Sequence, residues 1–378
     1  MTSNWKIREF IGEEGLRQLK SDWDSLLDEM EGPGFQHEYE THRAYYSNFG
    51  AVGDSCRFLV LMDGSRVRAI CPVEQMLKPV FLGSTSTWTL GNSRTHGIFL
   101  DLICPSNKAK QVLIPQVLRY LAEIPSGTHW LVYDHVLEGS VLWECLMSAN
   151  KTTYCIERTG ATDVLNCDRV FELLVQVNSK SHNRSLRKAR RRSEKNGVLS
   201  HRRSITQHEL THAFEVFVEL EASGKKGEYG NRGALCYKPD QLGFYRDLVT
   251  AFGMLGRCEI HTLELENRYV AAEICFQTGT ELASLKICYS EDDARIAPGL
   301  LLLDSVVERC CTDPDILRFN LISHQHWHQG WRPEIIPAYA VYIPLHRLRG
   351  PLLVWLLRIR LNYAPRVGRL LRWLRLKR

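Results

Sequence analysis

The sequence has no apolar run long enough to cross a membrane, no hydrophobic stretch near its start and no CxxC pair. A membrane span needs roughly 18 consecutive apolar residues, and a signal peptide needs an apolar core behind its first charges. We therefore expect neither in this chain. The 12 cysteines are scattered from Cys56 to Cys311, which is typical of small core residues in a reducing cytoplasm rather than of a disulfide framework.

Acidic residues are absent from the last part of the chain. The segment 347–378 carries ten Lys and Arg residues and no acid, so residues 1–346 have a net charge of −5, against +5 for the whole chain. A second basic segment, 180–203, has ten Lys and Arg residues and the single acid Glu194. Positive charge is thus concentrated in two segments of an otherwise acidic protein, which indicates anionic partners for them.

Disorder and fibrous structure are excluded, because 44% of the residues are hydrophobic and 24% are charged. A chain of 378 residues has room for roughly two domains. Both halves repeat one order of expected elements: helix, antiparallel strands, helix, strand. We predict an α/β (α+β) fold with two domains, each a mixed, mainly antiparallel sheet flanked by helices, followed by a basic tail. The predicted limits are 1–165, 166–346 and 347–378.

Local signals locate the elements of the second half. Thr206 and Glu209 form a capping box at the start of one helix, and Pro239 begins another. A closing strand of the first half is expected at 152–157. In the second half we expect strands at 259–265, 269–277, 282–289 and 316–322, with a helix that begins near Pro298.

Several motifs of the second half occur in the order typical of one enzyme family. They are the basic stretch 184–192, Leu220-Glu-Ala-Ser-Gly, Phe244-Tyr245, Lys286-Ile-Cys-Tyr, Ala297-Pro-Gly-Leu-Leu and Trp327-His-Gln-Gly-Trp. Here the chain resembles the CelD-like acetyltransferases of the GNAT superfamily, which are associated with bacterial exopolysaccharide and cellulose biosynthesis. It is also similar to the FemAB-like transferases, which carry two GNAT-like domains in tandem.

The resemblance implies an acyl-CoA-dependent N- or O-acyltransferase, an acetyltransferase for example. Its acceptor would be an amino- or hydroxy-sugar or a related compound, either a small molecule or linked to a carrier. No Ser or Cys nucleophile elbow stands out, so we expect direct transfer without an acyl-enzyme. Two alternatives stay open: a Fem-type aminoacyl-tRNA-dependent transferase, and a non-catalytic GNAT-fold scaffold of a polysaccharide synthesis complex.

The loop before Pro298 is the expected coenzyme A site. A strand runs through a polar loop into a helix whose first turn exposes backbone N–H groups, and such a terminus attracts phosphate. Proline at 298 replaces the first glycine of the family pattern and removes one amide donor. Locally, Pro298-Gly299 is equally typical of an ordinary helix start. The resemblance implies contacts with acetyl-CoA or another acyl-CoA by Ile287, Arg295, Pro298, Gly299 and Leu300.

Acyl transfer needs a group that takes a proton from the acceptor and one that protonates the leaving thiolate. Glu273 lies in the middle of an apolar strand, where burial would raise its pKa towards that of a useful base. Alternatively, it faces solvent. Tyr289 ends the strand before the loop, where GNAT enzymes often place a general acid. Alternatively, it is an amphipathic residue at the rim of the sheet.

Three histidines at 324, 326 and 328 would share one face of an extended segment, but no Cys or carboxylate stands at a supporting position, so we predict no metal site. The resembling family has a lysine where this chain has His328 and an aspartate where it has Asn320. His328 is expected to act as a base or, when protonated, as a cation for an anionic substrate. The resemblance implies substrate contacts by Arg184, Arg187, Lys188, Lys286, His326 and Trp331.

The two basic segments leave alternatives open. The segment 180–203, as a helix, is either a solvated connector or a phosphate-binding face for coenzyme A, a nucleotide-sugar or tRNA. Free nucleic acid is disfavoured, because no aromatic residues interleave the basic ones. The tail after Pro365 predicts a cationic amphipathic helix that either lies on an anionic membrane surface or packs on its own domain. We expect a cytoplasmic protein, peripheral on the inner face of the cell membrane if the tail binds lipid.

Overall fold

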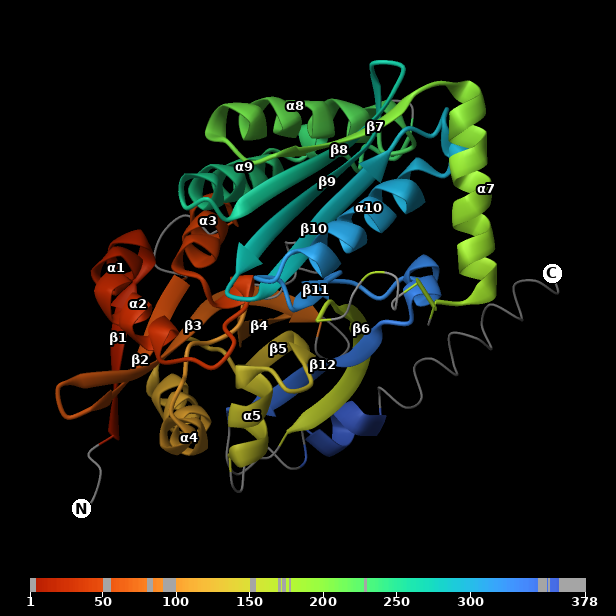
Figure 1. Ribbon diagram of the computed structural model, residues 1–378. Helices are drawn as coiled ribbons and strands as arrows, with labels where there is room; N and C mark the ends of the chain where they lie inside the picture. Colours follow the sequence, from red (N-terminus) through yellow and green to blue (C-terminus); the bar gives the residue numbers. More distant parts are fainter. Residues whose placement is uncertain are drawn as a thin grey trace.

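One 12-stranded sheet runs through the protein (Figure 1). The computed structural model describes residues 5–49, 56–79, 84–90, 100–149, 154–168, 171, 175–176, 178–227, 230–345, 352 and 354–359. The strands are β1 (Trp5–Ile11), β2 (Cys56–Asp63), β3 (Arg66–Pro79), β4 (Ser84–Thr89), β5 (Trp130–Leu137), β6 (Cys155–Asn166), β7 (Leu199–Ser204), β8 (Cys258–Leu265), β9 (Arg268–Thr278), β10 (Glu281–Tyr289), β11 (Arg318–Asn320) and β12 (Glu334–Pro344). Their order across the sheet is β1-β2-β3-β4-β5-β12-β6-β11-β10-β9-β8-β7.

Helices cover both faces of this sheet. The α-helices are α1 (Gly12–Gln18), α2 (Lys20–Asp28), α3 (Tyr39–Phe49), α4 (Asn107–Glu123), α5 (Val141–Ser148), α7 (Lys180–Asn196), α8 (Gln207–Ser223), α9 (Pro239–Met254) and α10 (Pro298–Thr312). Short 3-10 helices are η1 (Phe35–His37), η2 (Leu235–Tyr237), η3 (Ala294–Ile296) and η4 (His326–Trp331). Within the described ranges, no helix combines the length and the apolar character that crossing a bilayer requires.

The two halves of the sheet repeat one pairing pattern. In the half β1-β2-β3-β4-β5-β12, all neighbours are antiparallel except β4 and β5. In the half β7-β8-β9-β10-β11-β6, all are antiparallel except β10 and β11. The predicted fold class, mixed and mainly antiparallel strands flanked by helices, is thereby confirmed, but the two expected sheets are joined into one. The domain limits 1–165 and 166–346 stay predictions, because the sheet continues across them.

Each half of the sheet takes its last strand from the other half of the chain. Strand β6 pairs with β11 of the second half, and β12 pairs with β5 of the first. These two exchanged strands also pair with each other and so join the halves. The sequence places a strand at 152–157 as the end of the first half, whereas β6 extends to Asn166 and borders the second half instead.

Strand β9 is buried on both faces. Ala272, Ile274 and Phe276 share a cluster with residues of α8 and α9, while Ala271 and Cys275 pack with residues of α10 on the opposite face (Figure 1). Side chains of a strand alternate between its two faces, so apolar burial on both sides leaves no solvent-facing position in the middle. Glu273 is therefore fully buried, and the alternative that it faces solvent is excluded.

Local sequence signals are confirmed in the second half. The Thr206 hydroxyl accepts the Glu209 N–H at the start of α8, the Glu209 carboxylate accepts the Thr206 N–H in return, and α9 begins at Pro239. The strand predicted at 316–322 is shorter, because Ile322 adopts a positive φ of 59° and ends the extended run. The helix predicted after Pro365 lies outside the described residues.

Candidate active site

A cavity opens where strands β10 and β11 separate. Strand β11 pairs with β10 only over Glu281–Ala283, whereas β9 pairs with β10 as far as Tyr289. A bulge between Ser284 and Lys286 adds to the irregularity of this edge. The cavity beside it has a volume of about 880 Å³, which is in the range of small-molecule sites. The splayed strands thus leave room for an extended ligand along β10.

Glu273 contributes a buried carboxyl group to the wall of this cavity. Its Oε1 accepts a hydrogen bond from the Ser284 hydroxyl on β10, and its buried Oε2 has no partner among the described residues. Burial raises the pKa of Glu273 to about 7, although the Ser284 hydrogen bond opposes the rise. A carboxyl group with this pKa exchanges protons readily near neutral pH.

The amino-terminal turn of α10 forms another wall. Ala297 takes a left-handed conformation with φ of 51°, which turns the chain from η3 into the helix at Pro298. Gly299 follows, and a Cβ atom at this position would lie 3.2 Å from Cδ1 of the Tyr289 ring. Backbone N–H groups at such a terminus point towards the space before the helix, where they attract anions.

A buried ion pair supports the wall opposite α10. Nζ of Lys286 lies 2.9 Å from Oε1 of Glu221, which Nζ of Lys226 approaches at 3.0 Å. Burial would raise the pKa of Glu221, but the Lys286 ammonium and the Leu235 N–H outweigh it and hold that pKa below its ordinary value. Burial lowers the pKa of Lys286, and Glu221 opposes this shift. Lys286 is thus held by a carboxylate as well as facing the cavity.

Asp163 of β6 anchors the histidine segment. This fully buried carboxylate lies 2.9 Å from Nδ1 of His328 and 2.8 Å from Nδ1 of His324, and it accepts the Gln325 N–H at 3.2 Å. Burial lowers the pKa of His328, and the Asp163 carboxylate opposes the shift. The neutral ring therefore keeps its proton on Nδ1 towards Asp163, which leaves Nε2 as an acceptor. His328 lines the cavity.

The extended three-histidine face does not form, because the chain coils into η4 at His326. Among the described residues, no group of three or more His, Cys, Asp or Glu side chains is arranged to hold a metal ion. His324 and His328 converge on one carboxylate instead, so their arrangement is that of a hydrogen-bonded cluster.

Comparison with known families agrees with this geometry. Residues 180–326 match the family model of the acetyltransferase (GNAT) domain. The chain carries a GNAT-type acyltransferase domain. This match covers the amino-terminal turn of α10, the strands β8 to β10 and the basic helix α7. It confirms the acyltransferase expectation and leaves the CelD-like assignment a prediction.

Solved structures share the fold at low sequence identity. FemX has a TM-score of 0.57 at 11% identity, over 87% of this chain and 97% of that one. A tandem GNAT protein from the clavulanic acid biosynthesis pathway has a TM-score of 0.51 at 12% identity, over 90% and 99%. The carboxy-terminal domain of a putative lysylphosphatidylglycerol synthetase from Agrobacterium fabrum has 0.52 at 12%, over 87% and 92%. No curated protein matches the chain.

The cavity of the GNAT domain brings together many of the residues that the sequence analysis selects. Those that line it are Glu273, Lys286, Ile287, Tyr289, Pro298, Gly299, Leu300 and His328. Tyr289 lines the cavity and is 48% exposed, so part of this residue also reaches solvent. The proposed acid, base and phosphate-binding turn therefore share one space.

Other selected residues lie outside the cavity. Trp331 is fully buried in the core with its ring 4.1 Å from that of His182, whereas His326 and Arg295 are exposed. Asn320 is buried, and its side chain bonds to Thr162 and Glu281. The roles assigned to these positions remain predictions, and the buried position of Trp331 allows it to act only through its neighbours.

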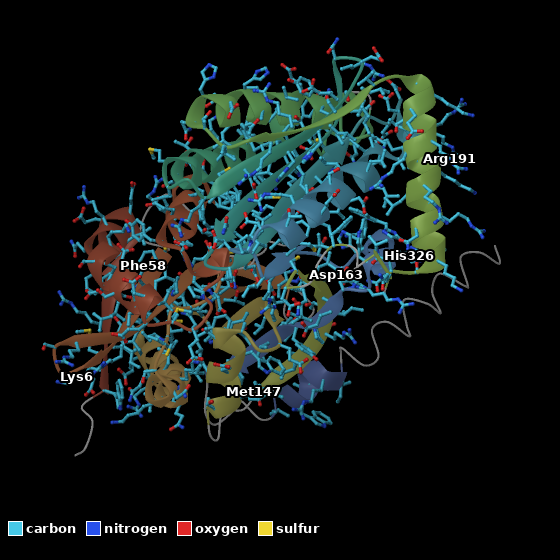
Figure 2. The ribbon with its side chains drawn as sticks, viewed as in Figure 1. Lys6, Phe58, Met147, Asp163, Arg191 and His326 are labelled. Atoms are coloured by element: carbon cyan, nitrogen blue, oxygen red, sulfur yellow. The ribbon has the colours of Figure 1, made fainter. Side chains whose placement is uncertain are left out.

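The basic helix α7 stands at the edge of the molecule (Figure 1). Its inner side packs Leu186 and Ala189 on the core, and Arg190 pairs with Asp304 of α10 at 2.6 Å. The outer side is exposed, and Figure 2 shows Arg191 pointing away from the sheet. The residues Arg184, Arg187 and Lys188 belong to this exposed side and not to the cavity wall.

Sequence reasoning missed the residues that hold the site residues in place. Asp163 gives no local signal, because it precedes His328 by 165 positions. Ser284 looks like an ordinary strand residue until the pairing of β9 with β10 places it opposite Cys275, from where its hydroxyl reaches Glu273. Glu221 lies within the motif that begins at Leu220, but with Glu219 two residues before it the sequence does not mark it as buried.

Proposed function

We propose that the protein transfers an acyl group from acyl-CoA to an amine or hydroxyl of its acceptor. The observation that carries this proposal is one cavity that joins a buried carboxyl group with a pKa of about 7 to the amino-terminal turn of a helix. The first supplies a base near neutral pH, and the second supplies a site for a diphosphate.

Coenzyme A would lie along the free edge of β10. Its diphosphate would sit before α10, against the backbone of Gly299 and Leu300, with the exposed Arg295 side chain beside it. Its pantetheine arm carries amides that can bond to the strand edge between Ser284 and Tyr289, which β11 leaves open. This direction points the thioester towards Glu273.

The reaction would be a direct transfer. Oε2 of Glu273 takes the proton of the acceptor amine or hydroxyl as that nitrogen or oxygen attacks the thioester carbonyl. The carbon–sulfur bond then breaks, and the Tyr289 hydroxyl gives a proton to the leaving thiolate. His328, oriented by Asp163, would hold the acceptor through Nε2, or would itself take the proton in place of Glu273.

The acceptor assignment rests on the resemblance to CelD-like acetyltransferases. By this resemblance, the acceptor would be an amino- or hydroxy-sugar of bacterial exopolysaccharide biosynthesis, either free or linked to a carrier. Lys226 and Asn231 line the cavity, and such groups suit the hydroxyl and phosphate groups of a nucleotide-sugar or a lipid-linked sugar.

The exposed face of α7 supports a second candidate, a Fem-type transferase that takes its acyl group from aminoacyl-tRNA. Its cations point into solvent rather than into the cavity, and FemX shares the fold.

Calorimetry separates the two candidates. Acetyl-CoA should bind the wild-type protein with measurable heat. Absence of heat at high acetyl-CoA, together with tRNA binding that weakens steeply with salt, would contradict the acyl-CoA proposal. If the protein binds neither acetyl-CoA nor tRNA, the non-catalytic scaffold of a polysaccharide synthesis complex would be the remaining alternative.

The rate of acyl transfer is expected to increase with pH, because Glu273 must lose its proton before it can act as a base. Burial raises the pKa of Glu273 to about 7, so the rate should increase through neutrality and level off above it. The measurement is kcat/KM for labelled acetyl transfer to a panel of amino- and hydroxy-sugars across this range. A rate that stays constant down to about pH 5 would contradict the role of Glu273, because a group of this pKa would then be protonated.

Replacing Asp163 by asparagine is expected to reduce kcat by about 10- to 100-fold, because the His328 ring loses the carboxylate that orients it. The pH profile should change as well, since His328 loses a neighbouring negative charge. The control is His324→Gln, which removes the exposed partner of the same carboxylate and should leave kcat near wild type. Wild-type kcat and pH profile in Asp163→Asn would contradict this positioning.

A further inference from the structure

The short helical segment near the end of the described chain has apolar side chains on both sides. Residues 352 and 354–359 are helical, and Val354 and Leu357 are 3% and 1% exposed. These two pack on the sheet against Trp130 and Val132 of β5 and Cys155 of β6. In Figure 1 the segment is the dark blue turn beside β6 and β12. Its inner side is thus a structural part of the protein.

The opposite side, which we call the outer face, consists of large apolar residues in contact with solvent. They are Leu352, Trp355, Leu356 and Ile359, with exposed fractions of 58%, 57%, 40% and 37%. A row of four such side chains within eight residues is a patch, unlike the single exposed apolar residues of ordinary surfaces. Apolar patches of this kind mark surfaces that bind another protein or a membrane.

Positive charge surrounds this patch in the sequence. The segment 347–378 has ten Lys and Arg residues and no acid, whereas residues 1–346 carry a net charge of −5. Arg358 lies within the helix and anchors it by donating a hydrogen bond from Nη2 to the Tyr154 carbonyl at 3.3 Å. Helices that lie in the headgroup layer of anionic bilayers have this composition: they combine Trp and Leu with basic residues and contain few acidic ones.

We propose that the outer face docks the protein on an anionic lipid membrane. Trp355 and Leu356 enter the boundary between headgroups and acyl chains, and the basic residues of 347–378 other than Arg358 contact the lipid phosphates. The outer face carries no polar side chain that would select a specific protein groove, and its charge surroundings match a negative surface. This inference does not depend on the acyltransferase proposal, because the outer face lies apart from the cavity-lining residues.

The test is flotation of the full chain with vesicles of phosphatidylcholine, with and without an equal share of phosphatidylglycerol. We expect binding to the anionic vesicles only, and weaker binding as NaCl rises from about 0.1 M to about 0.5 M. The double variant W355S/L356S should bind the anionic vesicles at least about tenfold more weakly than wild type, because it loses two apolar side chains that enter the lipid. Since both side chains are exposed, its thermal unfolding midpoint should match wild type.

The matched control is M254S/L255S, which removes two apolar residues at the end of α9 that are 72% and 51% exposed. It should bind the anionic vesicles like wild type. Equal binding of W355S/L356S and wild type would overturn the proposal, as would equal binding to neutral vesicles. Absence of vesicle binding combined with self-association that W355S/L356S abolishes would assign the outer face to a second copy of the chain instead. The salt dependence of wild type tests the proposal even if the double variant fails to fold.

Discussion

Replacing Glu273 by glutamine is expected to reduce kcat for acyl transfer by about 10²- to 10⁴-fold, with little change in acetyl-CoA affinity. Glutamine keeps the shape of the buried side chain and its hydrogen bond to Ser284, but it cannot take a proton. The loss should therefore appear in kcat rather than in binding. Labelled acetyl transfer measures the first quantity and calorimetry the second. A variant with wild-type kcat would assign the base to another group, with His328 as the next candidate.

Stability separates a chemical effect of this change from a structural one. Because burial raises the pKa of Glu273 from 4.5 to about 7, the folded protein holds this proton more tightly than the unfolded chain. The free energy of unfolding contributed by this group therefore falls as pH rises through that interval. Glutamine has no charge to bury, so above neutrality Glu273→Gln should unfold at a temperature no lower than wild type.

The neighbouring hydroxyl provides a second control. The hydrogen bond from Ser284 lowers the pKa of Glu273, so Ser284→Ala should move the midpoint of the pH–rate profile upwards. This variant keeps the base and should retain its rate at high pH. An unchanged midpoint would show that the titration belongs to a different group.

Replacing Gly299 by glutamate is expected to weaken acetyl-CoA binding by about 100-fold or more. The new side chain would meet the Tyr289 ring, because even its Cβ atom lies 3.2 Å from Cδ1. Its carboxylate would then stand where the helix terminus is expected to hold a diphosphate, and like charges repel strongly in a partly enclosed site. Calorimetry with acetyl-CoA measures the loss.

Gly299→Ala distinguishes repulsion from crowding. It adds the Cβ atom without the charge, so a small loss in Gly299→Ala beside a large loss in Gly299→Glu would identify repulsion as the cause. Both variants should keep the wild-type unfolding temperature within a few degrees, because the site is at a helix terminus. Unchanged affinity in Gly299→Glu would refute the placement of coenzyme A at this turn.

Local signals made the second half predictable. The capping box at Thr206, the proline at 239 and the alternation of β8 to β10 depend on residues within a few positions of each other, so one sequence contains them fully. The turn at Pro298-Gly299 was predictable for the same reason. The burial of Glu273 was left open, because a strand pattern alone does not tell whether a helix covers its second face.

Long-range pairing could not be deduced from the sequence. The support of His328 by Asp163 depends on β6 lying beside β11, which follows from strand exchange rather than from any local motif. The sequence did not decide whether the histidine segment is extended; it coils into η4, and His324 and His328 share one carboxylate. The basic segment 180–203 was expected as a helix, but α7 ends at Asn196 and the remainder enters β7; the position of α7 away from the cavity required its packing on α10.

Because of strand exchange, β5 must wait during synthesis for its partner β12. β5 leaves the ribosome early, but its neighbour β12 is made roughly 200 residues later, an interval of about 10 to 40 s at ordinary translation speeds. During this time the open backbone of β5 is a template for wrong partners. We expect expression of residues 1–165 alone to give aggregated protein, and the nascent chain to depend on chaperones until β12 emerges.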